Sequence, residues 1–271
     1  MAAISRTDKL ELSGIALFLD VDGTLLEIAA RPQAVSVPAD LRERLRTLHA
    51  AAGGAVALVS GRSVADLDAL FAPLKLPSAG LHGFERRGAS GAYRTRPLPP
   101  TAALESARTA MLHLALRHPG LHVEDKRFAF ALHYRGAPRL ESALISAMEE
   151  IAAGVTQHLE LQRGKMVIEL RPAGATKAQA VAEFLGEPPF AGRMPVFVGD
   201  DLTDEPAFEL VNRLAGASIV VSATRPSAAH ARLGDVAAVH AWLRELQDRP
   251  AAALRQLTSV EPRRDRLRSQ A

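Results

Sequence analysis

The sequence predicts an α/β protein, in which a doubly wound, mostly parallel sheet carries an inserted α+β domain. Short apolar runs alternate with helical patterns along most of the chain, and this alternation is typical of a parallel sheet with helices on both faces. Between about residues 100 and 173 the pattern changes to paired strands around a single helix. An α+β segment inside an α/β pattern is most simply explained as a second, smaller domain.

The first part of the chain contains two strand-then-helix units. Two apolar runs predict buried strands, and a leucine repeat at helical spacing after Pro38 predicts the helix between them. Ser63 is expected to cap the next helix, because its hydroxyl can accept a bond from a free backbone N–H. The predicted elements are a strand at 15–19, a helix ended by Gly53-Gly54, a strand at 55–59 and a helix at 63–71.

The last part of the chain repeats this organisation. A helix is expected from Thr176 to Leu185, followed by a buried strand at 196–198 that ends in Gly199. Thr203 is expected to cap the next helix. A run at 218–221 is expected to form the last strand.

The middle segment predicts strand pairs within 121–135 and 156–171, separated by a helix near 138–153. Arg163-Gly164 is expected to form a hairpin turn. Alternation places apolar side chains on one face of these strands and polar ones on the other. We predict a core of residues 12–99 plus 174–247, an inserted domain of 100–173, and a disordered basic tail of 248–271.

Composition restricts the class of protein. The chain has 271 residues, of which 48% are hydrophobic and 23% charged, as in an ordinary globular protein. Aromatic residues make up only 4%, which argues against nucleic-acid binding by base stacking. The absence of cysteine excludes disulfides, thiolate metal sites and a cysteine nucleophile, and suits a cytoplasmic protein. We expect no signal peptide and no membrane association, and a monomer is favoured, although the sequence does not determine the oligomeric state.

Charged and polar residues follow several predicted strands and begin one helix. Asp20 and Asp22 come directly after the first strand, Ser60 follows the second, and Asp200 and Asp201 follow the strand that ends in Gly199. Lys177 lies at a helix start, where a cation is unfavourable for the helix dipole. Because the carboxyl ends of parallel strands meet at one crevice, we expect these groups to converge.

This set suits phosphoryl transfer. Asp20 would be the nucleophile, and Asp22 would protonate the leaving alcohol and then deprotonate water. Ser60 and Lys177 would bind the phosphoryl oxygens, and Asp200 would help Asp20 and the Asp22 carbonyl hold Mg²⁺. Each feature also has a structural explanation, since acids are common in turns and at helix N-termini.

Four motifs follow one another along the chain: Asp20-Val21-Asp22-Gly23-Thr24-Leu25, Ser60-Gly61-Arg62, Lys177 and Gly199-Asp200-Asp201-Leu202-Thr203-Asp204-Glu205. In these motifs and their order the chain resembles the phosphatases of the haloacid dehalogenase superfamily, which implies a Rossmann-like core, and the position of the insert resembles that of a type IIB cap domain. Three narrower motifs are Gly80-Leu81-His82-Gly83-Phe84-Glu85, His133-Tyr134-Arg135 and Gly164-Lys165-Met166-Val167-Ile168-Glu169-Leu170-Arg171-Pro172. In these motifs the chain is similar to the trehalose-6-phosphate phosphatases.

The resemblance implies a Mg²⁺-dependent phosphatase that acts on trehalose 6-phosphate through an aspartyl-phosphate. The catalytic residues would be Asp20, Asp22, Ser60 and Lys177, and the metal residues Asp20, Asp22, Asp200, Asp201 and Asp204. We expect Asp200 to bind the metal directly and Asp204 to lie farther from it. The substrate-binding residues would be Arg62, His82, Gly83, Glu85, Lys126, His133, Arg135, Lys165 and Glu169. For His82 a structural role and a substrate contact both stay open.

Other functions remain possible at this stage. A phosphatase for sucrose phosphate or a glycosylglycerate phosphate would share the core and the cap type, and a phosphomutase would share the nucleophile. A phosphate-receiver switch, which is not an enzyme, also uses paired acids and a lysine. The residue that argues against the receiver is Asp22, because only turnover needs a second acid at that position. A catalytically inactive sugar-phosphate sensor would not need the complete set of acids.

Overall fold

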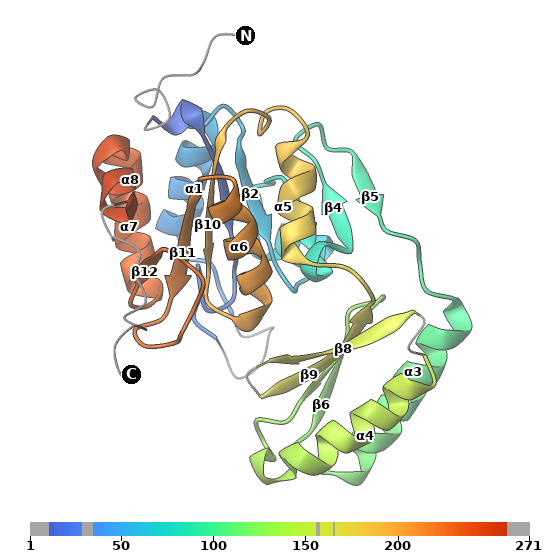
Figure 1. The fold of residues 1–271 in the computed structure, drawn as a ribbon. Helices are drawn as coiled ribbons and strands as arrows, with labels where there is room; N and C mark the ends of the chain where they lie inside the picture. The colour runs from blue at the N-terminus through green and yellow to red at the C-terminus, as the bar shows by residue number, and fades with distance from the viewer. Residues whose placement is uncertain (1–10, 29–34, 156–157, 165, 259–271) are drawn as a thin grey trace, which may run out of the picture.

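The computed structural model describes residues 11–28, 35–155, 158–164 and 166–258. They form two sheets, each with its own helices, and Figure 1 shows the smaller sheet below the larger one. The fold prediction, a mostly parallel core sheet with an inserted α+β cap, is confirmed. Within the described residues, no helix is long and apolar enough to cross a membrane.

The core sheet has eight strands, of which six run parallel and two continue one edge in antiparallel pairing. β1 lies near its centre, between β10 and β2. Such a position buries both faces of a strand and explains its continuous apolar run. In spatial order the strands are β12 (Ala231–Leu233), β11 (Ala217–Val221), β10 (Met194–Gly199), β1 (Ile15–Leu19), β2 (Val56–Val59), β3 (Ser78–Gly80), β4 (Glu85–Arg87) and β5 (Tyr93–Thr95).

Helices cover both faces of the core sheet, with α5 and α6 on one side and α1, α7 and α8 on the other (Figure 1). The side chains of β1 alternate between two apolar clusters: Leu17 packs with the residues of α1 and α7, and Phe18 packs with those of α5 and α6. Ser63 caps α2, as expected. The core helices are α1 (Ala39–Ala51), α2 (Val64–Phe71), α5 (Lys177–Leu185), α6 (Glu205–Arg213), α7 (Val236–Asp248) and α8 (Pro250–Thr258).

The cap is an antiparallel sheet with two helices, α3 and α4, on the side away from the core (Figure 1). The apolar faces of its strands pack on these helices, so that Phe130, Leu132, Ile168 and Leu170 join Met111 in one cluster. The opposite, polar face is therefore left toward the core. The elements are α3 (Thr101–Arg117), β6 (His122–Asp125), β7 (Phe130–His133), α4 (Glu141–Ala153), β8 (Leu159–Gly164) and β9 (Val167–Pro172), in sheet order β6-β7-β9-β8.

Several local predictions are wrong. β11 is not the last strand, because β12 adds to its edge. The hairpin reverses after Gly164, which still belongs to β8. Thr203 does not cap α6, because it lies inside a 3₁₀ turn (Leu202–Asp204) that Asp201 caps. The prediction also missed α3, β4 and β5.

The tail predicted from residue 248 is ordered at its start. Residues 250–258 form α8, in which Ala253 and Leu254 are buried against the core cluster. Trp242 of α7 donates a hydrogen bond to the carbonyl of Ala253. The basic composition predicted disorder, but α8 is an amphipathic helix, and burial of Ala253 and Leu254 stabilises it against the core. Residues 259–271 lie outside the described residues.

Candidate active site

The end of β1 places a buried carboxylate at the floor of a cavity. Asp20 is only 4% exposed, and its backbone N–H donates to Val198 of β10. Its Oδ1 accepts a bond of 2.7 Å from Lys177 Nζ, and its Oδ2 accepts one of 3.2 Å from Thr24 Oγ1. Burial, only partly offset by Lys177, raises the pKa of Asp20 to about 7.

Lys177 begins α5, in a position that the local sequence dictates. Thr176 and Gln179 form a capping box, which fixes the helix start and turns Lys177 into the core. Its amine also donates to Asp204 Oδ1 at 2.7 Å. Burial would lower the pKa of Lys177, but Asp20 and Asp204 outweigh that effect and hold it above its ordinary value. The amine therefore stays charged between two acids.

Asp20, Asp200 and Asp204 form an acidic cluster, with one ligand atom of each within 4.8 Å of the others. Burial, reinforced by Asp20 and Asp204, raises the pKa of Asp200 to about 9. Gly23 (φ +83°) makes room for this carboxylate, because a Cβ there would lie 2.1 Å from Asp200 Oδ2. Three carboxylates lie close together here, and Lys177 is the amine that two of them bond. Such a cluster of oxygen ligands suits a hard divalent cation.

Asp201 and Asp204 differ from Asp200. Asp204 is fully buried, and its two oxygens accept from Lys177 and from the backbone N–H of Asp201. Asp201 uses Oδ1 to accept from the backbone N–H of Leu202, and it lines the cavity. Asp204 thus orients the lysine and the loop. Whether either acid reaches a metal stays a prediction.

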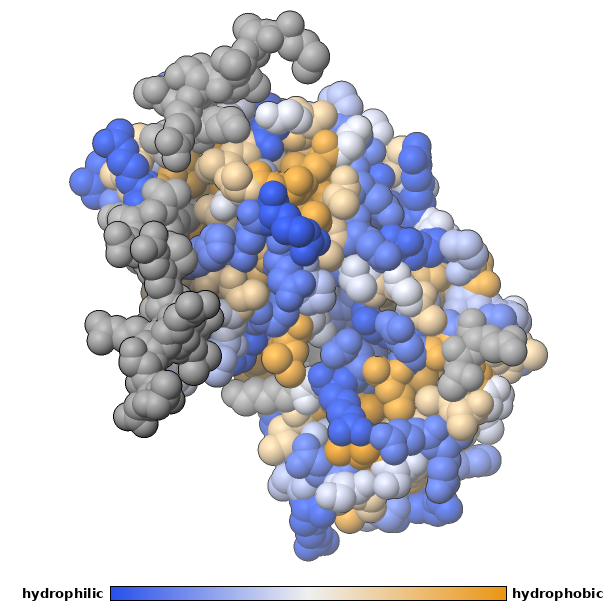
Figure 2. All heavy atoms as spheres, in the orientation of Figure 1, coloured by the Kyte–Doolittle hydropathy of each residue, from blue (hydrophilic) through white to orange (hydrophobic). Residues whose placement is uncertain are grey.

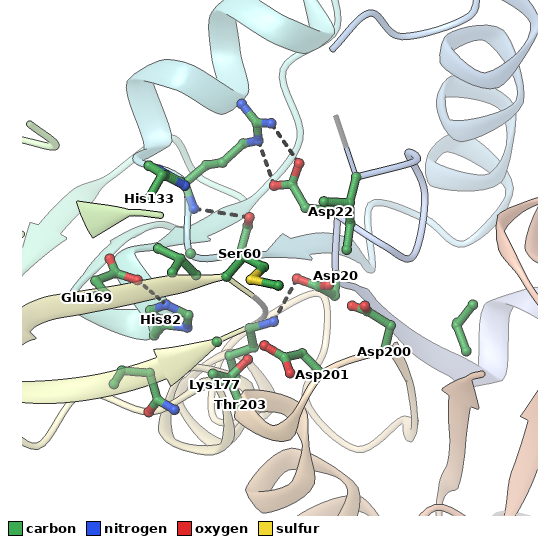
Figure 3. Close-up of a pocket in the computed structure, with 18 of the residues that line it drawn as sticks. Asp20, Asp22, Ser60, His82, His133, Glu169, Lys177, Asp200, Asp201 and Thr203 are labelled. Atoms are coloured by element: carbon green, nitrogen blue, oxygen red, sulfur yellow. Dashed lines mark hydrogen bonds and ion pairs between the residues drawn. The ribbon is translucent and has the colours of Figure 1, made fainter. Parts of the chain in front are cut away.

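Asp22 points toward a different partner. Arg62 donates to both of its oxygens, from Nε at 2.7 Å and from a terminal nitrogen at 2.6 Å, as Figure 3 shows. This bidentate pair fixes the plane of the carboxylate. Ser60, at the end of β2, lines the same cavity, and its hydroxyl accepts from the backbone N–H of Arg62.

The cap contributes a second group of charges on its polar face. Glu169 of β9 is buried, and its Oε1 accepts from Lys126 Nζ at 3.1 Å. Burial would raise the pKa of Glu169, but Lys126 and His82 outweigh it and hold the pKa below its usual range. His82 reaches the same carboxylate from the core. Lys126 in turn donates to the carbonyl of Gly61.

A cavity of about 490 Å³ joins these two groups. Its wall includes residues of the core, Asp20, Asp22, Ser60, Arg62, Lys177 and Asp200, and residues of the cap, Glu124, Lys126, His133, Arg135, Gln162 and Glu169. In Figure 3 Glu169 and His133 lie on the opposite side of the space from Asp20 and Asp200. The predicted convergence of the strand ends is therefore found.

Comparisons with known proteins agree with this geometry. The family model described as trehalose-phosphatase matches residues 18–237. The chain belongs to the trehalose-phosphatase family. The family prediction from the sequence motifs is confirmed, and the chain is a phosphatase.

Three similar proteins support the family and the fold. Trehalose-6-phosphate phosphatase of Escherichia coli is 44% identical over 239 residues, which cover 88% of each chain. The C-terminal domain of Candida albicans trehalose-6-phosphate phosphatase has the same fold, with a TM-score of 0.77 at 22% identity over 87% of this chain and 93% of that one. A phosphatase of the haloalkanoate (HAD) enzyme superfamily from Bacteroides thetaiotaomicron gives 0.61 at 16% identity, over 93% and 98%.

Two of the predicted substrate residues lie elsewhere. Glu85 is buried in the core, where its carboxylate accepts from the backbone N–H of Val64 at the start of α2 and from the Tyr93 hydroxyl. Gly83 lines a separate, smaller depression. A Cβ at this position would lie 2.7 Å from the carbonyl oxygen of Thr176. Both shape the turn that carries His82 and do not line the cavity. Lys165 lies outside the described residues.

Sequence reasoning missed Glu124 and Gln162. Glu124 accepts from His133 Nε2 at 2.8 Å, and this contact, despite burial, holds the pKa of Glu124 below its usual value. Glu124 is two residues before Lys126 on the same strand face, so alternation could have found it. Gln162 faces Glu169 in the pairing of β8 with β9, a register that only the structure shows.

Proposed function

We propose that the chain hydrolyses trehalose 6-phosphate to trehalose and phosphate through a covalent intermediate on Asp20. One observation carries the proposal: a single cavity joins crowded carboxylates of the core to charge-balanced polar groups of the cap. The core side suits a phosphoryl group and a cation, and the cap side suits the hydroxyls of a sugar.

Asp20 would attack phosphorus, so that a carboxylate oxygen–phosphorus bond forms while the bond from phosphorus to the sugar oxygen breaks. Asp22 would give its proton to the leaving oxygen. In the second step water attacks phosphorus, Asp22 takes a proton from that water, and the acyl-phosphate bond breaks to restore Asp20. Arg62 must loosen its hold on Asp22 in this cycle, because its bidentate contact occupies both oxygens of the carboxylate that would give and take the proton.

Ser60 and Lys177 would hold the phosphoryl oxygens and balance their charge. Asp20, Asp200 and the Asp22 carbonyl would hold Mg²⁺, with Asp201 or Asp204 contributing. The ion, when bound, neutralises charge on the transferring phosphoryl group. The raised pKa values of Asp20 and Asp200 support this assignment: burial is their main cause and the neighbouring acids add to it, and a cation would offset both effects.

The cap would recognise the sugar. Glu169, Lys126 and His133 present donors and acceptors on one sheet face, and Glu124 and Arg135 extend it. Lys126 is paired with Glu169, and His133 with Glu124, so that a neutral, hydroxyl-rich ligand can be bound without leaving these groups unbalanced.

The rival phosphatases, for sucrose phosphate or a glycosylglycerate phosphate, keep the same core chemistry and differ only in the cap contacts. A phosphomutase would return the phosphoryl group to a sugar hydroxyl. Membership of a phosphatase family removes the receiver switch. Cytoplasmic location and a monomeric state stay predictions.

The test is phosphate release from a panel of sugar phosphates, with Mg²⁺ and with EDTA, beside the Asp20→Asn protein. Trehalose 6-phosphate should give the highest kcat/KM, release should require the metal, and Asp20→Asn should show no turnover. Turnover by Asp20→Asn would contradict the covalent mechanism. A higher kcat/KM for another sugar phosphate would contradict the substrate.

A further inference from the structure

The turn that carries His82 has an unusual backbone. Leu81 (φ +48°) and His82 (φ +58°) both lie in the left-handed region, which is unfavourable for a residue that carries a side chain. The turn is held by two backbone bonds to the loop after β2, from Leu81 N–H to the Arg62 carbonyl and from His82 N–H to the Ser60 carbonyl. The surrounding structure therefore maintains this conformation and aims the imidazole.

The imidazole of His82, a core residue, contacts the cap. It is 7% exposed, and its Nε2 lies 3.2 Å from Glu169 Oε2. In Figure 3 the two side chains face each other and a dashed line joins them. Gly61 leaves room for the ring, because a Cβ at that position would lie 2.8 Å from Nε2. The absence of a side chain at Gly61 thus leaves the space in which His82 reaches the cap.

The protonation of His82 follows from its partner. Burial lowers the pKa of His82, so that the ring is neutral and carries one N–H. A carboxylate only accepts hydrogen bonds, so Nε2 holds the proton and donates to Glu169. The other nitrogen, Nδ1, is buried and has no hydrogen-bond partner among the residues that the structure describes.

Glu169 has two kinds of partner. Lys126 belongs to the cap, so that it moves with Glu169. His82 belongs to the core, so that its bond to Glu169 exists only while the cap is against the core. Two of the roughly four acceptor positions of the carboxylate are used, and Glu169 lines the cavity.

We propose that His82 is a positioning residue, through which the core orients Glu169 for the sugar when the cap is closed. The proposal rests on the proposed function, because it takes Glu169 as a sugar contact. It makes sugar recognition depend on closure: an open cap presents Glu169 without its second donor. His82 itself transfers no proton in the reaction.

The test compares His82→Asn with the wild type on trehalose 6-phosphate and on p-nitrophenyl phosphate, at saturating Mg²⁺. Asparagine tolerates a left-handed backbone, so the turn is kept, but its side chain is too short to reach Glu169. We expect kcat/KM for the sugar phosphate to fall at least about tenfold more than that for the small ester, mostly through KM, because one charge-assisted bond is lost. His113→Asn, an exposed change on α3, should leave both values unchanged.

A double-mutant cycle with Glu169→Ala shows whether His82 acts through Glu169. Alanine removes the acceptor of the His82 bond, so we expect the double variant to match Glu169→Ala alone within about threefold, because the same contact is removed twice. Multiplied losses, or equal losses of His82→Asn on both substrates, would overturn the proposal and assign His82 a purely structural role. A wild type that releases no phosphate from trehalose 6-phosphate would overturn the proposed function as well, so the two failures are distinguishable.

Discussion

The core and the cap bring acids to the same cavity in opposite electrostatic states. In the core, burial and mutual repulsion raise the pKa values of Asp20 and Asp200 to about 7 and about 9. In the cap, Lys126 and the facing histidines overcome burial and hold the pKa values of Glu124 and Glu169 below their usual range. The core therefore has more acids than positive charges, an imbalance that a bound cation would offset. In the cap the acids are already balanced by their partners.

This difference separates two tasks. An unbalanced cluster favours a charged ligand, such as a metal ion with a phosphoryl group. A balanced one keeps its ionised groups fixed as hydrogen-bonding partners for neutral hydroxyls. On the side of the molecule that Figure 2 draws, hydrophobic and hydrophilic residues are interspersed on both the core and the cap.

The largest effect is expected from Lys177→Met. The change removes the amine that bonds Asp20 and Asp204, so that charge on the phosphoryl group is no longer balanced from this side. We expect kcat/KM to fall at least about a thousandfold on both trehalose 6-phosphate and p-nitrophenyl phosphate. Circular dichroism and a melting curve check that the variant is folded. A loss on only one substrate would contradict the assignment of Lys177 to the phosphoryl transfer, which both substrates share.

Lys126→Met makes the same chemical change in the cap. It removes the amine beside Glu169 and the bond that this amine donates to the carbonyl of Gly61 in the core, but it removes no side chain that we assign to the phosphoryl transfer. We expect kcat/KM for trehalose 6-phosphate to fall about tenfold more than that for p-nitrophenyl phosphate. Equal losses on the two substrates would show that the cap acts on the chemistry and not on the sugar.

Removing the metal should make the core sensitive to pH. Folded-state pKa values of about 7 and about 9 lie above the ordinary value of 3.8 for aspartate, so the folded protein binds more protons than the unfolded one. The resulting stability is complete below pH 4 and is lost as the pH rises through 7 and 9. In EDTA we expect the Tm to fall by several degrees between pH 5 and 9, and Mg²⁺ should reduce the slope.

Asp200→Asn is the control for that experiment, because it removes one of the two raised carboxyl groups. Its Tm in EDTA should depend less on pH than that of the wild type. A wild-type Tm that rises with pH in EDTA would contradict the excess of acids over positive charges that we assign to the core.

The smallest effect on turnover is expected from Leu254→Ala, which belongs to neither group of acids. Leu254 of α8 is 1% exposed and packs in the apolar cluster between this helix and the core sheet. Its truncation should lower the free energy of unfolding by about 3 kcal/mol. Urea unfolding measures this loss, while kcat per folded molecule should stay constant. A change in the ratio between the two substrates would mean that α8 influences the cavity.

The core site was predictable because its signals are local. Asp20, Ser60 and Asp200 each follow an apolar run, and parallel strands bring their ends together whatever the intervening chain does. Lys177 was identified by its order among these motifs and its unusual place at a helix start.

The cap site was only partly predictable, because its contacts depend on register and on packing across the core boundary. Glu85 shares a sequence motif with His82 but turns into the core to meet Val64. Gln162 reaches the cavity through the pairing of β8 with β9. Likewise, α8 packs on α7 and on the core cluster, tertiary partners that composition does not reveal.

The most direct test of the division between core and cap is the ratio of kcat/KM for trehalose 6-phosphate to kcat/KM for p-nitrophenyl phosphate, measured in Glu169→Gln. The substitution keeps the shape of the side chain and removes the charge that Lys126 and His82 hold. We predict that the ratio falls at least tenfold, with most of the small-ester activity kept. A ratio equal to that of the wild type would contradict the assignment of sugar recognition to the cap.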